Sequence, residues 1–438
     1  MSAFEKWQPS RRQLLGAAGA LGLGTLLASC AGPGSGAGGQ TGGAELQPGG
    51  EVKGDLSFAH WRGEDRDAFE ALIEKFTEKY PGTTITQDIS TSTDYSAQAL
   101  RRLRDGKIGD VAPALRGDQF NQFTNADFFV PLDDTGLTEK YQANLIGVGA
   151  KDGKQYGYPY QIVYNVPIAN MDILSSVGVT EAPTYWDAYI DMLDKIKAKG
   201  ITPIAFPGAH TGDAGQLMNS MVMNLAPSDD MFAKIQSGEY KCTDDWFLEM
   251  LRRYQELGNY IQPSAAGTAP EAAQQMFVTG QAALLSAGSY YIATMRSLGA
   301  TFPIDLAPAR TNAEGEGKYE GIYNATFILG INSRGDNKQT ALAWLEFLSD
   351  PANAGFYGDA TAQHTSVAGV TYENPDLMRI APWMDKNLLL APRFQFLDTD
   401  MRNTVEATGL LVMTGTSPEQ AAEDAQKIVD ERIAATEG

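Results

Sequence analysis

The sequence predicts a mixed α/β protein with two domains, preceded by an export signal and a linker. Three observations carry this prediction. Segments rich in β-branched residues alternate along the chain with amphipathic segments of helical period. About 388 residues follow the signal and linker, which is enough for two domains of ordinary size. The hydrophobic content of 43% is typical of a globular protein.

The N-terminus predicts export and a lipid anchor. The run SRRQLL at 10–15 has the form of a twin-arginine export motif. The apolar stretch 14–27 is shorter than the roughly 20 residues that span a bilayer. It ends in LASC, which resembles a bacterial lipobox whose Cys30 thiol is acylated. Residues 1–29 are then a signal peptide, and the mature protein is held on the outer face of the cytoplasmic membrane. An ordinary signal peptide with a coincidental cysteine is the alternative.

The composition of the rest of the chain indicates a tether, an acidic folded body and one unpaired cysteine. Residues 30–50 are mostly Gly, Ser, Gln and Pro, which predicts a flexible tether and a folded body from Glu51 onward. The net charge of −20 gives no electrostatic reason to bind nucleic acid or anionic lipid headgroups. If Cys30 is lipidated, Cys242 has no disulfide partner, and we expect it to be a small buried residue.

The expected elements begin with strands at 55–61, 83–89 and 110–115, separated by helices at 64–80 and 95–105. This order predicts parallel strands with right-handed crossovers. The segment 156–168 carries alternating tyrosines and Pro159, which predicts an edge or crossover strand. The remaining expected elements are a helix at 184–199, a strand at 201–206, helices between 237 and 280, strands at 282–287, 302–307 and 323–332, and helices at 337–348 and 418–435.

Six stretches resemble, in this order, the extracellular solute-binding protein family typified by maltose-binding protein. They are FEALIEKFTEKYPG (69–82), GKQYGYPYQIVYNVPI (153–168), APTYWDAYIDMLDKIKAKGITPIAF (182–206), AAQQMFVTGQAALLSAGSYY (272–291), ILGINSRGDNKQTALAWLEFLSD (328–350) and SPEQAAEDAQKIVDERI (417–433). Together they extend over nearly all of 51–438, and it is their shared order that carries the resemblance.

The resemblance implies a two-lobed, periplasmic-binding-protein-like (Venus-flytrap) fold whose lobes are discontinuous in sequence. Lobe 1 would be 51–160 plus 318–357, and lobe 2 would be 161–317 plus 358–438. It also implies a monomeric binding protein without cofactor, which takes a small-molecule sugar into the cleft between its lobes. Closure about a hinge would then present the sugar to the membrane subunits of an ABC importer.

Candidate ligand-binding residues follow from where the expected strands end, because ligands of α/β sheets bind beyond the carboxyl ends of the strands. Aromatic rings suit the C–H faces of a sugar, and polar side chains suit its hydroxyls. The tyrosines therefore favour a sugar over a peptide, a polyamine or a sulfonate. The predicted set is Trp61, Arg62, Thr91, Ser92, Arg116, Asp118, Tyr158, Tyr160, His210, Asp213, Ser289, Tyr290, Gly321, Tyr323 and His364.

Several of these residues have a structural alternative. Trp61 fits a core position, Arg116 and Asp118 fit a surface pair, and one face of the tyrosine strand must pack. His364 fits a satisfied structural histidine. Tyr290 stands where the family often has a stacking tryptophan, which leaves the stacking ring open. We expect Phe394 and Phe396 to belong to the core, with stacking on the ligand as the alternative.

Two other classes of function lack their motifs. A hydrolase or lyase needs paired carboxylates or a nucleophile with a base, and the acidic pairs at 133–134, 229–230 and 244–245 are sequence neighbours that point different ways. A metal-binding lipoprotein needs clustered ligands, but the three histidines are far apart in sequence and no cysteine cluster accompanies them. The sequence therefore predicts a binding protein, not an enzyme.

Overall fold

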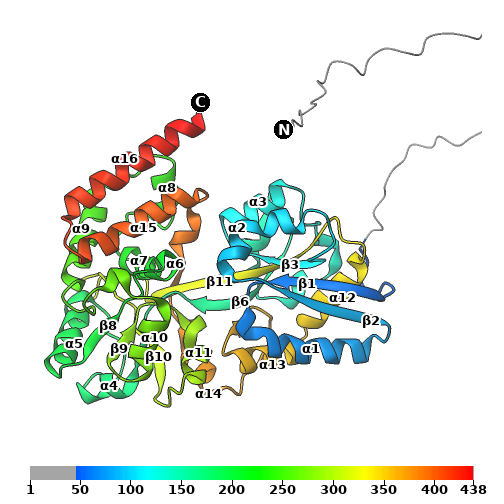
Figure 1. The fold of residues 1–438 in the computed structure, drawn as a ribbon, viewed down its shortest axis with the longest axis horizontal. Coiled ribbons are helices and arrows are strands. Elements are labelled where there is room, and N and C mark those ends of the chain that lie inside the picture. Colours follow the sequence, from blue (N-terminus) through cyan, green and yellow to red (C-terminus); the bar gives the residue numbers. More distant parts are fainter. Residues whose placement is uncertain (1–45, 438) are drawn as a thin grey trace, which may run out of the picture. The chain divides into compact units, whose positions relative to one another are not determined.

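The computed structural model of the protein describes residues 46–437 (Figure 1). The twin-arginine run, Cys30 and residues 30–45 of the expected tether lie outside the described residues. None of the described helices is long and apolar enough to cross a membrane. Leu46 packs against an apolar core, and the Gln47 backbone N–H donates to the Gln339 amide oxygen at 3.3 Å. The folded body therefore begins about five residues before the expected start at Glu51.

The first strands pair in parallel, as the sequence predicts. β1 (Gly54–His60) lies between β2 (Thr83–Ile89) and β3 (Val111–Ala114). The sheet continues through β11 (Gly321–Ile331), β6 (Tyr158–Tyr164) and β12 (His364–Thr365), and β13 (Leu388–Leu390) pairs with the start of β11. Its helices are α1 (Arg66–Lys79), α2 (Ser92–Leu103), α3 (Asp118–Asn125), α12 (Lys338–Leu348) and α13 (Pro351–Thr361).

A second sheet has the order β10 (Ile304–Leu306), β7 (Ile168–Asn170), β9 (Ala282–Leu285) and β8 (Thr202–Ala205). β4 (Ala150–Lys151) and β5 (Lys154–Gln155) form a separate hairpin. The helices of this half of the fold are α4 (Met171–Ser176), α5 (Trp186–Ala198), α6 (Thr211–Ala214), α7 (Gln216–Val222), α8 (Met231–Gln236), α9 (Asp245–Leu257), α10 (Pro270–Val278), α11 (Ile292–Ser297), α14 (Pro375–Ile380), α15 (Thr399–Met413) and α16 (Pro418–Glu437).

The apolar residues divide into separate cores, one set for each sheet, and this makes the fold two-lobed. The first sheet has a core on each side, and the second sheet lies in a larger core that also holds the buried Cys242. Along β6 the core changes from that of lobe 1 at Tyr160 to that of lobe 2 at Tyr164. Along β11 it changes from lobe 2 at Ile322 to lobe 1 at Phe327.

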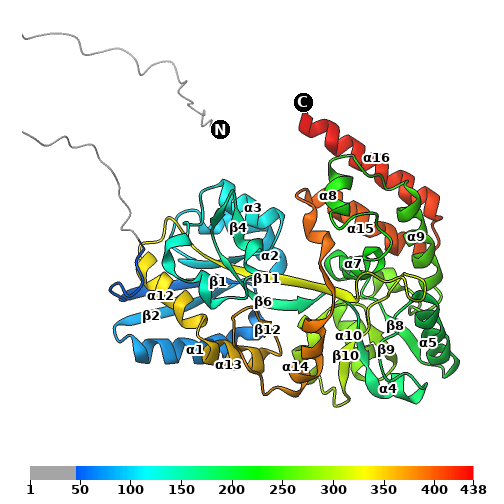
Figure 2. The ribbon, with the colours of Figure 1, turned by 180° about the vertical axis from the view of Figure 1, so that it is seen from behind.

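β6 and β11 therefore join the two lobes as one antiparallel ribbon, seen from both sides in Figures 1 and 2. Pro159 is tolerated in β6 because β12, the strand on the other side, pairs only at Gln161 and Ile162. The crossover strand that the sequence predicts is present. Tyr158 and Tyr160 are fully buried in it, however. The Tyr158 hydroxyl shares a hydrogen bond with the Thr138 hydroxyl, and the Tyr160 hydroxyl donates to the Leu348 carbonyl.

The sequence missed several elements near the C-terminus. Helices α13, α14 and α15 and the short strands β12 and β13 were not expected. Val367 and Val370 still pack in the lobe 1 core, beyond the expected end of lobe 1 at residue 357. β12, β13 and α14 are short, and α13 and α15 mix small, polar and apolar residues without a clear apolar stripe, so neither group gives a strong periodic signal.

Trp344 tests the lobe 1 core. Its ring is fully buried and lies edge-on to Phe76 at 5.3 Å between centroids. Trp344→Ala is expected to lower the free energy of unfolding of this lobe by about 3–5 kcal/mol, because it removes a large apolar side chain and leaves a cavity. Urea denaturation followed by circular dichroism measures the change. Met378→Ala, at a side chain that is 58% exposed, is the control and should stay within about 0.5 kcal/mol of the parent. Equal losses in both variants would contradict the assignment of the core.

Candidate binding site

The carboxyl end of β1 carries a buried ionic group. The Arg62 guanidinium donates to both oxygens of Asp65, at 2.9 and 3.1 Å, and forms an ion pair with Glu64 at 2.8 Å. Burial opposes the charge of Arg62, but the two carboxylates outweigh burial and raise its pKa. Asp65 is almost fully buried, whereas about half of the Glu64 side chain is exposed. The pair thus fixes Arg62 and leaves the Glu64 carboxylate available as an acceptor.

Trp61 precedes this group and is half-buried. Its ring centroid lies 4.9 Å from that of Phe327, in an edge-to-face contact, and 5.1 Å from that of Tyr95. The Tyr95 hydroxyl donates to the Pro113 carbonyl at 2.7 Å, which fixes that ring in turn. The Trp61 ring is therefore held in one orientation while part of it stays accessible. The contacts with Phe327 and Tyr95 are those of a core residue, and the accessible part of the ring is what a cleft position requires.

Arg116 follows the carboxyl end of β3 and reaches the crossing strands. Its Nε donates to the Asn324 side-chain oxygen of β11 at 3.1 Å, and its Nη2 donates to the Ala391 carbonyl. Its guanidinium also lies 5.3 Å from the centroid of the Phe394 ring. Burial lowers the pKa of Arg116 to about 10, so the group remains charged at neutral pH.

The crossing ribbon presents a polar face to these groups. In the antiparallel register Asn324 lies opposite Val163, and Thr326 lies opposite Gln161. Directly opposed residues share a face and residues two apart share a face, so Asn324, Thr326 and Gln161 lie together. The Gln161 amide donates to Asp65 at 3.2 Å, just as Asn324 accepts from Arg116. The ends of β1 and β3 thus meet on one face of the ribbon.

Lobe 2 contributes a carboxylate that anchors two tyrosines. Asp213, on α6 after the end of β8, accepts a hydrogen bond from the Tyr290 hydroxyl at 3.2 Å and one from the Tyr291 hydroxyl at 2.9 Å. The two rings follow β9, and their centroids lie 4.8 Å apart at an angle of 55°. His210 lies 3.0 Å from the same carboxylate, and this hydrogen bond raises its pKa. Both rings are partly exposed and cannot turn freely.

Three contacts link this part of lobe 2 to β6, to Asn165 just after it and to the segment before β12. The Tyr164 backbone N–H donates to the Ser289 hydroxyl at 2.9 Å, and the Asn165 amide donates to the Gln216 side-chain oxygen at 2.8 Å. The Gln363 amide donates to the Tyr290 carbonyl at 3.5 Å. Burial, followed by the Asp213 carboxylate, raises the pKa of Tyr291, and the charge of Glu64 in lobe 1 adds to the rise. The polar groups of the two lobes are therefore within electrostatic reach of one another.

The structure brings some predicted residues together and leaves others apart. Arg116 and, through Asp65, Arg62 reach the polar face of the ribbon, and Trp61 packs on Phe327 of β11. In lobe 2, His210 and Tyr290 meet at Asp213, and Ser289 bonds the β6 backbone. Tyr158 and Tyr160 belong to the lobe 1 core. Thr91 instead caps α2 by accepting from the Asp94 N–H, and the side chain of Ser92 lies outside the described part of the structure.

Four further predicted residues have structural surroundings. Asp118 begins α3 and accepts from the Thr399 hydroxyl at 3.1 Å. Tyr323 lies opposite Tyr164, on the face of the ribbon that does not carry Asn324. Gly321 pairs with Leu388 beneath Trp383, where an added Cβ would lie 3.1 Å from the tryptophan ring. His364 is buried edge-on between Tyr164 and Tyr372, with ring centroids at 6.1 and 4.9 Å.

Five residues of this arrangement were not among the predicted ones: Glu64, Asp65, Gln161, Tyr291 and Asn324. Glu64 and Asp65 were read as the start of a helix, although they follow the predicted Arg62 within three residues, a spacing at which side chains on one turn meet. Gln161 and Asn324 had no signal of their own, because only the register of β6 against β11 places them on one face. Phe396 is a core residue as expected, whereas Phe394 is partly exposed under Arg116.

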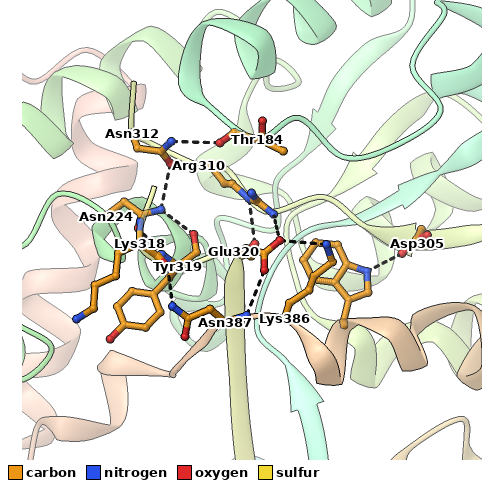
Figure 3. A network of polar contacts seen from close by, with 11 residues as sticks. Thr184, Asn224, Asp305, Arg310, Asn312, Lys318, Tyr319, Glu320, Lys386 and Asn387 are labelled. Atoms are coloured by element: carbon orange, nitrogen blue, oxygen red, sulfur yellow. Dashed lines mark hydrogen bonds and ion pairs between the residues drawn. The ribbon is translucent and has the colours of Figure 1, made fainter. Parts of the chain in front are cut away.

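Two cavities lie elsewhere and share no residue with this site. One of about 340 Å³ adjoins Asn224 and Lys318, and one of about 290 Å³ lies between Arg310, Trp383 and Lys386. Figure 3 shows the network between them, in which Glu320 accepts from Lys386 at 3.1 Å and forms an ion pair with Arg310 at 3.7 Å. Among residues 46–437, no three His, Cys, Asp or Glu side chains are grouped so that they could hold a metal ion.

Comparison with known proteins assigns the family. The model of the bacterial extracellular solute-binding protein family matches residues 62–355. The chain belongs to this family. An uncharacterized ABC transporter extracellular-binding protein of Pyrococcus horikoshii is 24% identical over 305 residues, which are 67% of each chain. A probable sugar-binding periplasmic protein of Brucella suis is 23% identical over 249 residues, 55% of this chain and 58% of that one.

Solved structures share the fold at low sequence identity. A chitin oligosaccharide binding protein superposes with a TM-score of 0.72 at 22% identity, over 87% of this chain and 99% of its own. The bacterial solute receptor AcbH, described as preferring β-D-galactopyranose, gives a TM-score of 0.75 at 18% identity, over 87% and 100%. A Bacillus licheniformis sugar transporter in complex with stachyose gives 0.70 at 16%, over 85% and 98%. These likenesses confirm the two-lobed fold of the solute-binding family.

The three histidines are expected to titrate in two ranges. Burial lowers the pKa of His60 and His364 to about 4, whereas the bond to Asp213 raises that of His210 above 6.5. Between pH 6.5 and about 4 the unfolded chain protonates His60 and His364 before the folded chain does, so their contribution to stability falls. The contribution of His210 is present below pH 6.5 and is lost as pH rises through its raised pKa. Histidine-ring NMR titration measures all three groups.

Asp213→Asn is the matched variant for this titration. It should lower the pKa of His210 and leave those of His60 and His364 unchanged, because only His210 contacts Asp213. A parent His210 that titrates at or below 6.5 would contradict the site geometry.

Proposed function

We propose that this chain is the solute-binding component of an ABC importer and that it binds a carbohydrate in the cleft between its lobes. The observation that carries the proposal is the pair of fixed, partly exposed aromatic groups, one in each lobe, at the carboxyl ends of strands. Trp61 is held by Phe327 and Tyr95, and Tyr290 and Tyr291 are held by Asp213. Several of the structures that share the fold are described as sugar-binding proteins.

The chemistry of the site suits a sugar. Rings that cannot turn lose little entropy when the C–H face of a pyranose stacks on them. Glu64, Asp213 and His210 supply acceptors and a donor for hydroxyls at the edges of these rings. Asn165 Oδ1 and Thr326 Oγ1, on the crossing ribbon, are buried atoms without a protein hydrogen-bond partner among the described residues. A buried polar atom of this kind costs about 1–3 kcal/mol until it is paired, and a ligand hydroxyl or a water molecule can pair it.

Binding would act through closure of the lobes. Lobe 1 is proposed to be 51–160 plus 318–357, extended at its start to residue 46, and lobe 2 to be 161–317 plus 358–438. The change of core along β6 supports the boundary at 160, whereas Ile322 in the lobe 2 core and Val367 in the lobe 1 core favour later positions for the second and third boundaries. A ligand that contacts both lobes favours the closed state by its differential affinity, and the importer would recognise that state. We expect a monomer with no catalytic turnover.

A carbohydrate panel tests this function. A thermal-shift screen of the exported body should show saturable stabilisation by at least one saccharide, because a ligand that binds only the native state raises the melting temperature. Trp61→Ala and Tyr290→Ala are each expected to weaken that binding by about 10-fold or more, since each loses a stacking ring.

Trp246→Ala is the control for these variants. Trp246 is a partly buried tryptophan on α9 that contacts Tyr240 and lies outside the site. It should leave the affinity unchanged. Stabilisation by a peptide or a polyamine and by no saccharide would replace the carbohydrate with another solute, and hydrolysis of a glycan would replace binding with catalysis.

We also propose that the protein is exported by the twin-arginine route and anchored through an acylated Cys30 on the outer face of the cytoplasmic membrane. The support is the order of three sequence features: the arginine pair, the short apolar stretch and LASC at its end. A single acyl chain anchors weakly, so the diacyl modification of a bacterial lipoprotein is required for stable attachment.

Metabolic labelling with a fatty-acid analogue tests the anchor. Cys30→Ala should abolish the label and release the protein from the membrane fraction, whereas Cys242→Ala should keep both because that thiol is buried in lobe 2. Lysine in place of Arg11 and Arg12 should leave the precursor unprocessed inside the cell. Label retained by Cys30→Ala would disprove the lipobox assignment.

A further inference from the structure

We propose that the carbohydrate carries a carboxylate, as a uronic acid does, and that Arg116 is the residue that binds it. This inference rests on the proposed function, because it names the chemical class of ligand for the same site. It starts from a feature of the free protein: a half-buried guanidinium with neutral partners only, at the junction of the two lobes and the polar face of the crossing ribbon.

The partners of Arg116 are an amide oxygen, a backbone carbonyl and an aromatic ring, from Asn324, Ala391 and Phe394. Among the described residues no carboxylate lies within ion-pair distance of it. Two of its five N–H groups are accounted for by these hydrogen bonds, which leaves donors on its outer nitrogens. The planar fork of a guanidinium matches a carboxylate with two parallel bonds.

Arg62, Arg393 and Arg310 differ from Arg116 in this respect. Arg62 is neutralised by Asp65 and Glu64. Arg393, which contacts the same Phe394 ring at 5.5 Å, is neutralised by Glu406 through two bonds of 2.7 Å. Even Arg310, away from the site, has Glu320 at 3.7 Å. Arg116 has no such partner, although the chain has 54 acidic residues to 34 basic ones.

The acids of the site do not cancel this positive charge. Glu64 is paired with Arg62, and Asp213 accepts from two tyrosines and lies beside His210. An anion placed at Arg116 would therefore meet a cation whose burial is uncompensated in the free protein. A partly buried charge gains most from a partner that it lacks, because burial has already removed part of its hydration. A ligand carboxylate would supply that partner.

The position of Arg116 also fits a ligand that bridges the lobes. It lies on lobe 1 at the end of β3, it bonds the crossing strand at Asn324, and it bonds the lobe 2 segment at Ala391. Aromatic groups of both lobes adjoin the same ribbon. A saccharide stacked on one of these rings could place a carboxylate at Arg116 while its hydroxyls reach Glu64 or Asp213.

Matched pairs of neutral and acidic sugars test the inference. Isothermal titration of the exported body with galactose against galacturonate, with glucose against glucuronate, and with short oligomers of each should show that an acidic member binds at least 10-fold more tightly than its neutral counterpart. This preference should fall as NaCl rises from 50 to 500 mM, because added salt screens the charge–carboxylate attraction. Sodium acetate at equal concentration is the control for a free anion.

Arg116→Gln should remove the preference for the acidic sugar, because it replaces the charged guanidinium with a neutral amide. Arg116→Lys should retain part of the preference, because it keeps the charge and loses the fork. Arg379→Gln, at an exposed arginine of α14 outside the site, should change nothing. If Arg116→Gln does not fold, the salt dependence of the parent and the Arg116→Lys variant still decide.

The outcomes separate this inference from the proposed function. Tight binding of a neutral sugar with equal or weaker binding of its acidic counterpart overturns the inference and leaves the function standing. A preference for the acidic sugar that survives Arg116→Gln overturns the role of Arg116. Equal stabilisation by acetate alone overturns the saccharide class. Binding of no saccharide at all overturns the proposed function and the inference together.

Discussion

The antiparallel pairing of β6 with β11 is the constraint on which the rest of the structure depends. Both strands leave one hydrophobic core and enter the other, so their register sets how the lobes meet and which side chains line their junction. A slip of one residue would exchange the two faces of the ribbon and remove Gln161 and Asn324 from Asp65 and Arg116. The tyrosines buried at 158 and 160 oppose such a slip, because their rings fill the lobe 1 core. The alternating tyrosines resemble an aromatic binding stripe in the sequence. In the structure, Tyr158 and Tyr160 are core residues that fix the register and so align Gln161 and Asn324.

The proposed binding groups are fixed by contacts within the free protein. One carboxylate orients two tyrosines in lobe 2, and one guanidinium is held by two carboxylates in lobe 1. Each anchor is mostly buried, where a hydrogen bond is stronger than in water. Affinity for a flexible polar solute is limited by the ordering of side chains and solute together, and here the ordering of the side chains precedes binding. In the proposed closure, the lobes would move as bodies while the groups within each lobe keep their geometry.

Sequence patterns predicted the parts of the fold that depend on local periodicity. β2 has the bounds expected from its β-branched residues, α1 and α5 differ from expectation by one or two residues at either end, and the parallel β1–β2–β3 arrangement follows from their order. Arg62, Arg116 and Asp213 could be proposed from the sequence because each lies in the segment that follows the end of a strand. Gln161 and Asn324 could not, because their position depends on the pairing of distant strands. For Tyr323, alternation identifies two faces of the strand without saying which one carries Asn324.

The pairing of buried charges can indicate a binding residue that hydrophobic periodicity does not reveal. In an acidic protein, an arginine near a cluster of carboxylates acquires one at little cost, and Arg62 and Arg393 show the usual result. A guanidinium that is buried among neutral partners must have the cost of burying its charge offset by packing contacts or by a bound anion. Packing accounts for the contact of Arg116 with Phe394, but a neutral side chain of similar length could make that contact without the cost of burying a charge. The carboxylate of the proposed ligand would supply the anionic partner that this guanidinium lacks in the free protein.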